Sequence, residues 1–328
     1  MEDLTILITL KDRSSYTYRL MRHLNETKCP FKVLLADGGA DQTLEDNLRN
    51  HINYPDVDYR YIRYSYDKTL NDYYNKMKES ALAVDTPFVV CIDNDDLTVD
   101  TGMQKSVDFL KSNSNYAASR GALQGFTYHM ADRPSSPIER QGNMYSEFPD
   151  DITGEDACGR IIDQSSHFHG NWHSVMYSNH LVTTTTLIEE FSPSNLRFVE
   201  QLYGFLNVVW GNSNREQYDY LLHQHGTPRV EGGDGQFPAQ DAWIVETDWS
   251  KNLAKMIDAI TVGIMAQDNL HQTKINSVRN LITKHYKAMY YKRVADRELL
   301  NTQIDNSKDY YRSNERLMFV VNQIKNIL

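Results

Sequence analysis

Residues 87–96 read PFVVCIDNDD, a short apolar run followed directly by an acidic turn. The run at 87–92 is typical of a buried strand. Asp93, Asp95 and Asp96 then stand at its carboxyl end, where like charges repel and burial penalises each ionised group. A divalent cation bridging to a phosphorylated ligand would offset that cost, because Mg²⁺ and Mn²⁺ prefer hard oxygen ligands. A solvated acidic turn that ends a strand and caps a helix is the alternative, and these residues alone leave both open.

The chain before this stretch repeats a pattern of strand, polar loop and helix. Residues 4–10 (LTILITL) predict a buried strand, and the residues after it predict a helix at 16–25 with Ser14 or Ser15 as its N-cap. Similar patterns predict strands at 31–36 and 59–64 and helices at 41–50 and 70–84. Alternation of this kind favours an α/β fold with a largely parallel sheet.

Acidic residues fall at the ends of two of these predicted strands. Asp37 follows the strand at 31–36 and precedes Gly38 and Gly39, which permit a sharp turn. The Asp93 group follows the strand at 87–92 in the same way. Because ligands of open parallel sheets bind outside the carboxyl ends of the strands, we expect both groups to border one ligand site.

The second part of the chain has a different character. Residues 121–170 are polar and rich in Gly, Ser, Pro and Asp, which predicts loops and short strands. Residues 172–177 and 181–187 predict further strands, and 195–210 predict a helix with one apolar stripe. That stripe consists of Phe198, Leu202, Phe205 and Val209. The spacing of apolar residues from about 250 to 328 predicts a helical appendage.

The composition narrows the class of protein. Hydrophobic residues make up 40% and charged residues 24%, as in water-soluble globular proteins. A net charge of −10 argues against a nucleic-acid binder that relies on a basic surface. Three cysteines without metal-type spacing fit a reducing compartment. The acidic start lacks the pattern of a signal peptide, and no run approaches the ~20 apolar residues of a membrane span. We therefore expect a cytoplasmic protein, either free or at the inner face of a membrane.

Two common phosphate-binding patterns are missing from the sequence. Gly38-Gly39 is not part of a GxGxxG fingerprint, and no GxxxxGK[ST] segment occurs. Hydride transfer and P-loop phosphoryl transfer are therefore disfavoured.

Three segments in order carry a resemblance to a known family. LTILITLKDR (4–13), VLLADGGADQT (33–43) and FVVCIDNDD (88–96) resemble, in order and spacing, the nucleotide-sugar half of family 2 glycosyltransferases with the GT-A fold. The resemblance covers about the first 110 residues, becomes looser to about 230, and does not extend to the C-terminal helices. It implies a Rossmann-like mixed, mostly parallel sheet in a catalytic domain at 1–245, with a nucleotide-sugar half at about 1–115 and an acceptor half at 116–245. A helical region at 246–328 follows.

The resemblance implies a donor site along the strand ends. It places the segment from Thr9 and Leu10 to Asp12 and Arg13 beside the nucleotide, with Asp12-Arg13 where the family commonly has Asn-Arg. Asp37 matches the second Asp of the family's Asp-Asp-Gly-Ser turn, which hydrogen-bonds the base. Ala36 replaces the first Asp of that turn.

The acidic tetrad matches the family's DxD pair. In this resemblance Asp93, with Asn94 beside it, contacts the ribose or a metal-bound water, and Asp95 coordinates Mn²⁺ or Mg²⁺ between the phosphates. Asp96 either orients a neighbour or caps the next helix, and we favour the cap. His225, in a segment similar to the family's Tyr-Arg-x-His, would be a further metal ligand, with His223 where Arg is usual. Imidazole suits Mn²⁺ better than Mg²⁺. A pair of surface histidines is the alternative.

The general base is predicted on the acceptor side. The family usually carries Glu-Asp at the start of a helix there, and Glu200 occupies about that place, with Gln201 where the Asp would be. Glu200 lies off the apolar stripe, so that it faces either a cleft or solvent. Glu189 and Glu190 are alternatives, although Pro193 nearby makes that segment resemble a loop.

Two further groups of side chains allow more than one interpretation. His167, His169 and His173 lack zinc-type spacing, so we interpret them, with Asn171 and Trp172, as an acceptor-binding loop; Trp172 filling the core is the alternative. A basic-aromatic patch near the C-terminus would suit anionic lipid headgroups, a solvated helix face or a contact between copies of the chain. The patch comprises Lys284, Tyr286, Lys287, Tyr290, Tyr291, Lys292 and Arg293.

Taken together, the sequence predicts a metal-dependent glycosyltransferase that is inverting by resemblance. The donor would be a nucleotide-diphospho-sugar, with a UDP-sugar favoured, and the acceptor a glycan or lipid-linked hydroxyl. A sugar-phosphate nucleotidyltransferase is the second hypothesis, but the segment at 10–13 lacks the glycines of that class. A non-catalytic glycan-binding protein with the same fold is the third, because Gln201 replaces the expected acid.

Overall fold

The structure of the chain is a computed structural model. It describes residues 3–127, 139–143, 150–166, 168, 170–194, 196–225, 249–267 and 276–284. The segments at 226–248 and 285–328, and with them most of the C-terminal basic-aromatic patch, lie outside the described residues, as do His167 and His169.

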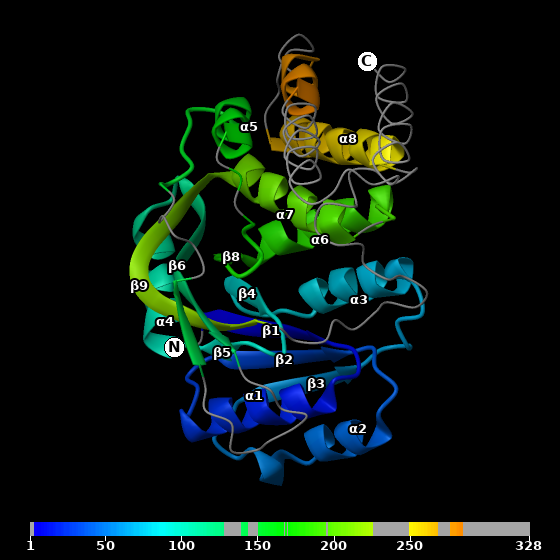
Figure 1. The fold of residues 1–328 in the computed structure, drawn as a ribbon, viewed down its shortest axis with the longest axis vertical. Coiled ribbons are helices and arrows are strands. Elements are labelled where there is room, and N and C mark those ends of the chain that lie inside the picture. The colour runs from blue at the N-terminus through cyan, green and yellow to red at the C-terminus, as the bar shows by residue number, and fades with distance from the viewer. Residues whose placement is uncertain are drawn as a thin grey trace, which may run out of the picture.

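A single mixed sheet organises the fold (Figure 1). Its strand order is β3-β2-β1-β4-β8-β6-β9-β5, with β7 paired to β6. The first four strands are parallel to one another, whereas β8 is antiparallel to both β4 and β6. Their bounds are β1 Leu4–Leu10, β2 Lys32–Asp37, β3 Tyr59–Arg63, β4 Phe88–Ile92, β5 Leu97–Thr98, β6 Tyr116–Thr127, β7 Glu139–Asn143, β8 Val175–Tyr177 and β9 Asn212–His225.

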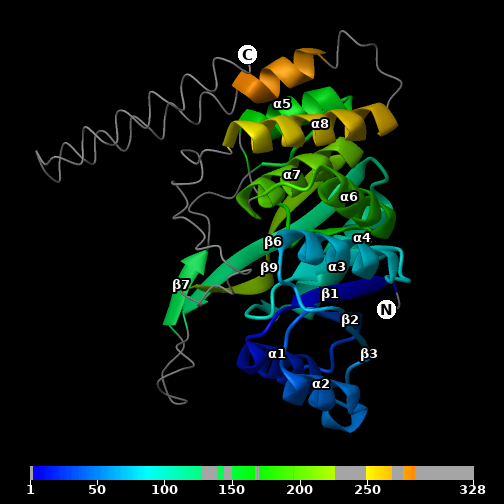
Figure 2. The same ribbon diagram turned by 90° about the vertical axis from the view of Figure 1, so that its right-hand side faces the viewer.

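Helices cover both faces of the parallel part of the sheet (Figures 1 and 2). Figure 1 shows α1 and α2 on one face and α3, α6 and α7 on the other, with α5 and α8 stacked beyond α7. Figure 2 shows the long strands β6 and β9 running side by side. The bounds are α1 Ser14–Glu26, α2 Gln42–Arg49, the 3₁₀ turn His51–Asn53, α3 Leu70–Leu82, α4 Asp100–Ser112, α5 Ala157–Ser166, α6 Ser178–Phe191, α7 Leu196–Trp210 and α8 Trp249–Gln267. A further helix covers 276–284.

Two hydrophobic clusters fill the space on the two faces. On β1, Ile6 and Ile8 belong to the cluster under α1 and α4, and Leu7 belongs to the cluster that contains α3, α6 and α7. Side chains alternate in this way because successive residues of a strand point to opposite faces. Both faces of the strand are therefore buried, which explains its continuous apolar sequence.

The N-terminal elements were predicted to within a few residues, but the predicted cap of one helix is wrong. α1 begins at Ser14, and the residue before it, Arg13, has left-handed backbone angles instead of a serine cap. The Ser14 hydroxyl donates to Asp41, which itself caps α2 by accepting from the backbone N–H groups of Thr43 and Leu44. The serine thus links two helix starts.

The predicted strand at 181–187 is wrong, because the segment lies in helix α6. Its β-branched residues favour strands in isolation. In the helix, the hydroxyl of Thr185 donates to the Leu181 carbonyl oxygen at 2.9 Å, and the Trp210 indole donates to Thr184 at 3.0 Å. Packing of one helical face against α3 and α7 therefore outweighs the local preference.

The middle of the chain contains more regular secondary structure than its polar composition indicated. In the range 121–170, where we expected only loops and short strands, the chain completes the long strand β6 (Tyr116–Thr127) and forms helix α5 (Ala157–Ser166). α5 is anchored by buried Arg160, which donates to the carbonyl oxygens of Val208 and Val209. The charged side chain of Arg160 thus joins α5 to the end of α7.

The helical character predicted after residue 249 is seen in α8. Its buried residues, among them Leu253, Met256 and Ile260, join the same cluster as α7. Among the described residues, no helix is long and apolar enough to cross a membrane. The boundary at 245/246 stays a prediction.

Candidate functional site

The site forms where β1, β2 and β4 end. β1 lies between the other two, so the loops after all three strands leave the same edge of the sheet. In the loop after β1, Asp12 and Arg13 both adopt left-handed angles, with φ of 53° and 56°. Such angles are uncommon outside glycine and often mark functional turns. A Cβ on Gly39 would lie 2.7 Å from the Asp12 nitrogen, so glycine is needed where the two loops meet.

The side chains of Thr9 and Leu10, at the end of β1, are turned into the protein. The Leu10 side chain is fully buried, and its carbonyl oxygen accepts from the Lys76 ammonium at 2.7 Å. Thr9 is partly buried beside Tyr73, with which its hydroxyl interacts. The Asp12 carboxylate accepts from the Ala40 N–H at 3.0 Å. Contact of these residues with a nucleotide stays a prediction.

Asp37 is held by a network of protein donors. Its carboxylate accepts from the Gly39 N–H at 2.7 Å, the Tyr61 hydroxyl at 2.6 Å and the Arg63 guanidinium at 2.7 Å. Only 1% of the residue is exposed. The network fixes the turn after β2, and the prediction that Asp37 also contacts a base is untested.

Asp95 is paired with a cation of the protein itself. Arg13 lies 2.7 Å from the Asp95 carboxylate and also stacks over the Tyr16 ring. Asn94 is buried and donates to the Thr17 hydroxyl at 3.0 Å, so it supports the start of α1. The structure therefore brings Arg13, Asn94 and Asp95 together, with Arg13 against the carboxylate proposed for the metal, and their contacts with a donor stay a prediction.

Asp93 lies at the rim of the site. Its side chain is 45% exposed. Partial burial and then the negative charge of Asp95 raise the pKa of Asp93 to about 6. The charge of Glu200 adds to this rise, which indicates that the start of α7 faces the end of β4.

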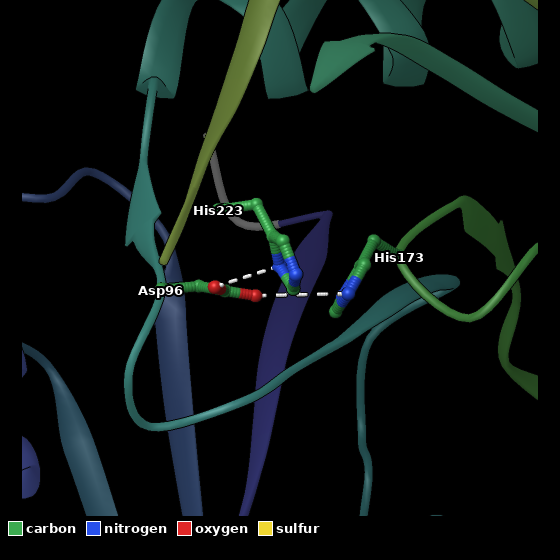
Figure 3. Close-up of side chains that lie close together, drawn as sticks. All are labelled: Asp96, His173 and His223. Carbon is green, nitrogen blue, oxygen red and sulfur yellow. Dashed lines mark ion pairs between the residues drawn. The ribbon is translucent and has the colours of Figure 1, made fainter. Parts of the chain in front are cut away.

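Asp96, His173 and His223 converge behind that rim (Figure 3). The His223 Nδ1 lies 3.0 Å from one Asp96 oxygen, and the His173 Nε2 lies 3.6 Å from the other. Among the residues that the structure describes, these three form the one group whose ligand atoms are close enough for a metal ion, all within 4.8 Å of one another. Asp96 follows β4, His173 precedes β8, and His223 lies in β9.

The prediction that Asp96 caps the next helix is wrong. α4 begins at Asp100 with Val99 in the cap position. Asp96 is fully buried and accepts from the backbone N–H of Gln224 at 3.1 Å. The short strand β5 separates Asp96 from the helix and turns its carboxylate toward β9 instead.

The two histidines of this group have opposite charge preferences. Burial lowers the pKa of His173 to about 4, which leaves it neutral near pH 7. Burial also disfavours the charged form of His223, but the hydrogen bond to Asp96 and the surrounding carboxylates outweigh it and raise the pKa of His223 to about 9. Without a cation in the group, His223 is therefore an imidazolium that pairs with Asp96.

The pair of His223 and Asp96 predicts that the stability of the metal-free protein depends on pH. Because the pKa of His223 is about 9 in the folded state and ~6.5 in an unfolded chain, its stabilisation is complete below about pH 6.5 and disappears as the pH rises through about 9. We expect His223→Gln to lower the unfolding free energy by about 2 kcal/mol at pH 6 and by much less at pH 10. Urea denaturation in EDTA measures both values, and equal losses at the two pH values would contradict the assignment.

Glu200 lies in the first turns of α7 and is exposed. The stripe beside it, with Phe198 and Leu202, is buried as predicted. The alternatives Glu189 and Glu190 lie in α6 rather than in a loop, and Glu189 is paired with Lys78 at 2.5 Å. Of the three acids, Glu200 is the one whose charge acts on Asp93.

The remaining candidates are placed outside the group of three. His225 ends β9, with its ring centre 5.3 Å from that of His223. Asn171 is fully buried and accepts from Arg215 at 3.1 Å, and Trp172 packs on Tyr203. Asn171 therefore supports the structure, and Trp172 contributes to the core, as its alternative interpretation held.

His173 and Asp96 are the site residues whose position the sequence did not reveal. Both stood in segments that we singled out, but His173 was grouped with its neighbours at 167 and 169. A histidine two residues before the start of β8 was the available signal. Its distance in sequence from Asp96 gives no pattern that links the two.

The comparisons with known proteins show the fold. No family model and no curated protein matches the sequence. The crystal structure of S. aureus TarS residues 1–349 with UDP-GlcNAc aligns with a TM-score of 0.55 and 12% identity, over 99% of this chain and 81% of that chain. The same TarS fragment with UDP aligns with a TM-score of 0.50 and 13% identity, over 87% of this chain and 72% of that chain. The fold is that of the GT-A glycosyltransferases, which confirms the expected fold class.

Proposed function

We propose that this protein is a glycosyltransferase that moves a sugar from a nucleotide-diphosphate donor to a hydroxyl of a glycan or lipid-linked acceptor, with the help of a divalent cation. The observation that carries the proposal is that the loops after β1, β2 and β4 leave the same edge of the sheet, where the charge of Glu200 acts on Asp93. The GT-A fold supports it, since a protein of similar fold was crystallised with UDP-GlcNAc.

The proposed chemistry needs two kinds of group. Departure of the nucleotide diphosphate leaves negative charge, which a divalent cation would neutralise. A carboxylate on the acceptor side takes the proton from the attacking hydroxyl, and Glu200 is the candidate. A single carboxylate acting as base suits direct displacement, and therefore inversion at the anomeric carbon.

The residues after β4 fit a cation. Asp96 has one buried carboxylate oxygen that no hydrogen-bond donor among the described residues satisfies. Two imidazoles stand next to it, and Asp93 lies 4.0 Å from one of them. When bound there, the cation would supply charge for the departing diphosphate.

Nucleotide binding tests the donor site. We expect calorimetric titration to show binding of one of UDP, GDP and dTDP, with UDP favoured, and tighter binding in the presence of Mn²⁺. ADP, which carries the same diphosphate, is the matched control for recognition of the base. Failure of all three nucleotides would overturn the proposal. Binding of a nucleotide without transfer to any acceptor would favour the non-catalytic glycan-binding alternative suggested by Gln201.

A further inference from the structure

We infer that Asp96, His173 and His223 form a binding site for a first-row transition-metal ion, held by two imidazoles and one carboxylate. The use of this ion rests on the proposed function, because it would serve the donor diphosphate. These ligands differ from Asp95 and His225, the two that the sequence predicted.

The Asp96 carboxylate is fully buried, and one of its oxygens lacks a hydrogen-bond donor among the described residues. A fully buried carboxylate is costly unless each oxygen has a partner. One oxygen accepts from the Gln224 N–H and faces His223, but the other finds no hydrogen-bond donor in the described part of the chain. That oxygen points toward the His173 Nε2, at 3.6 Å, as Figure 3 shows. A cation between the two atoms would satisfy it.

A backbone contact fixes which ring nitrogen of His173 carries the proton. Its Nδ1 lies 3.2 Å from the carbonyl oxygen of Cys91, and that oxygen can only accept. The proton of the neutral ring is therefore on Nδ1, and the lone pair of Nε2 faces the carboxylates of Asp96 and Asp93. The His173 Nε2, one Asp96 oxygen and one Asp93 oxygen are then three acceptor atoms, and the ring nitrogen has no proton to share with either oxygen. Metal-binding histidines commonly have this arrangement, with the other ring nitrogen donating to a backbone carbonyl.

The three neighbouring carboxylates differ in the positive charge that faces each of them. Arg13 already neutralises Asp95 at 2.7 Å, whereas the described residues place no arginine or lysine in an ion pair with Asp93 or Asp96. His223 pairs with Asp96 and so occupies the place of a cation. A metal ion would displace its proton and use the ring as a ligand. Asp93, half exposed at the rim, remains available toward the donor.

The ligand set determines which ion is preferred. Imidazole nitrogen favours ions such as Mn²⁺, Co²⁺ and Zn²⁺, whereas Mg²⁺ prefers oxygen ligands and retains its water. We therefore expect the metal-free protein to bind Mn²⁺ and Zn²⁺ at least about tenfold more tightly than Mg²⁺. A site built of carboxylates alone would not discriminate in this way.

Metal titration without nucleotide tests the site directly. Mn²⁺ and Mg²⁺ are titrated into the EDTA-treated full chain by calorimetry, and pulsed electron paramagnetic resonance of bound Mn²⁺ detects nitrogen coupling from imidazole. We expect His173→Gln and His223→Gln each to weaken Mn²⁺ binding at least about tenfold and to reduce the nitrogen signal. His225→Gln and Asp95→Asn are the matched controls and should retain both.

Three results would overturn the inference: no Mn²⁺ binding by the wild-type chain, binding without nitrogen coupling, or loss of binding in His225→Gln and Asp95→Asn but not in the two test variants. Because His173 is buried, circular dichroism establishes that each variant is folded, and the near-isosteric Asp96→Asn provides a second test of the same site. UDP titration in EDTA separates the two proposals. Nucleotide binding with no metal at these residues would overturn only this inference, and metal binding with no nucleotide affinity would overturn only the proposed function.

Discussion

Glu200→Gln is expected to reduce sugar transfer by at least about 10²-fold while leaving the affinity for the donor nucleotide unchanged. The substitution keeps the shape of the side chain but removes the carboxylate that would take the acceptor's proton. Glu200 is exposed at the start of α7, and its charge acts on Asp93 at the end of β4. Transfer rates at saturating donor, together with calorimetric affinity for the nucleotide, separate a catalytic effect from a binding effect.

Glu190→Gln provides the matched control. Glu190 is also exposed on a neighbouring helix, α6, and was an alternative candidate in the sequence. We expect this variant to retain wild-type transfer. Full activity of Glu200→Gln would exclude Glu200 as the base. Loss of nucleotide affinity in that variant would instead indicate that Glu200 belongs to the donor site.

Lys76→Met is expected to lower the unfolding free energy by about 3–5 kcal/mol. Lys76 and Asp67 form an ion pair in which both side chains are almost fully buried. The ammonium also donates to the Leu10 carbonyl oxygen at the end of β1, so the pair supports the strand end that carries the site. Its removal leaves the Asp67 charge buried and unpaired against Gly38, where there is no space for a Cβ. Urea denaturation measures the loss.

Lys78→Ala is the control for this prediction, because Lys78 pairs with Glu189 at 2.5 Å but both side chains are about one-third exposed. We expect a loss below about 1 kcal/mol, since exposed ion pairs are screened by solvent. The double variant Lys76→Met, Asp67→Asn should recover part of the loss, because no unpaired charge remains. A similar loss in the two lysine variants would show that burial of the Lys76–Asp67 pair has no special effect.

Local sequence was sufficient to predict a strand or helix where that element buries a contiguous apolar face. β1, β2 and β4 are short apolar runs enclosed on both faces, so their positions and the residues at their ends could be predicted. α6 could not, because its run of threonines favours a strand until the helix packs against α3 and α7. The αL turn at Arg13 was equally hidden, since it depends on the approach of Gly39 from another loop.

The sequence by itself therefore determined the α/β class, the largely parallel character of the sheet and the acidic end of β4, because these follow from the local pattern of strand, loop and helix. Only the tertiary structure decided how the acids divide. Asp95 pairs with Arg13 from the loop after β1, whereas Asp96 faces His173 and His223 from segments that the sheet brings alongside β4 through β8, β6 and β9. Strand order in a mixed sheet is set by packing between distant segments, and no local pattern in the chain records it.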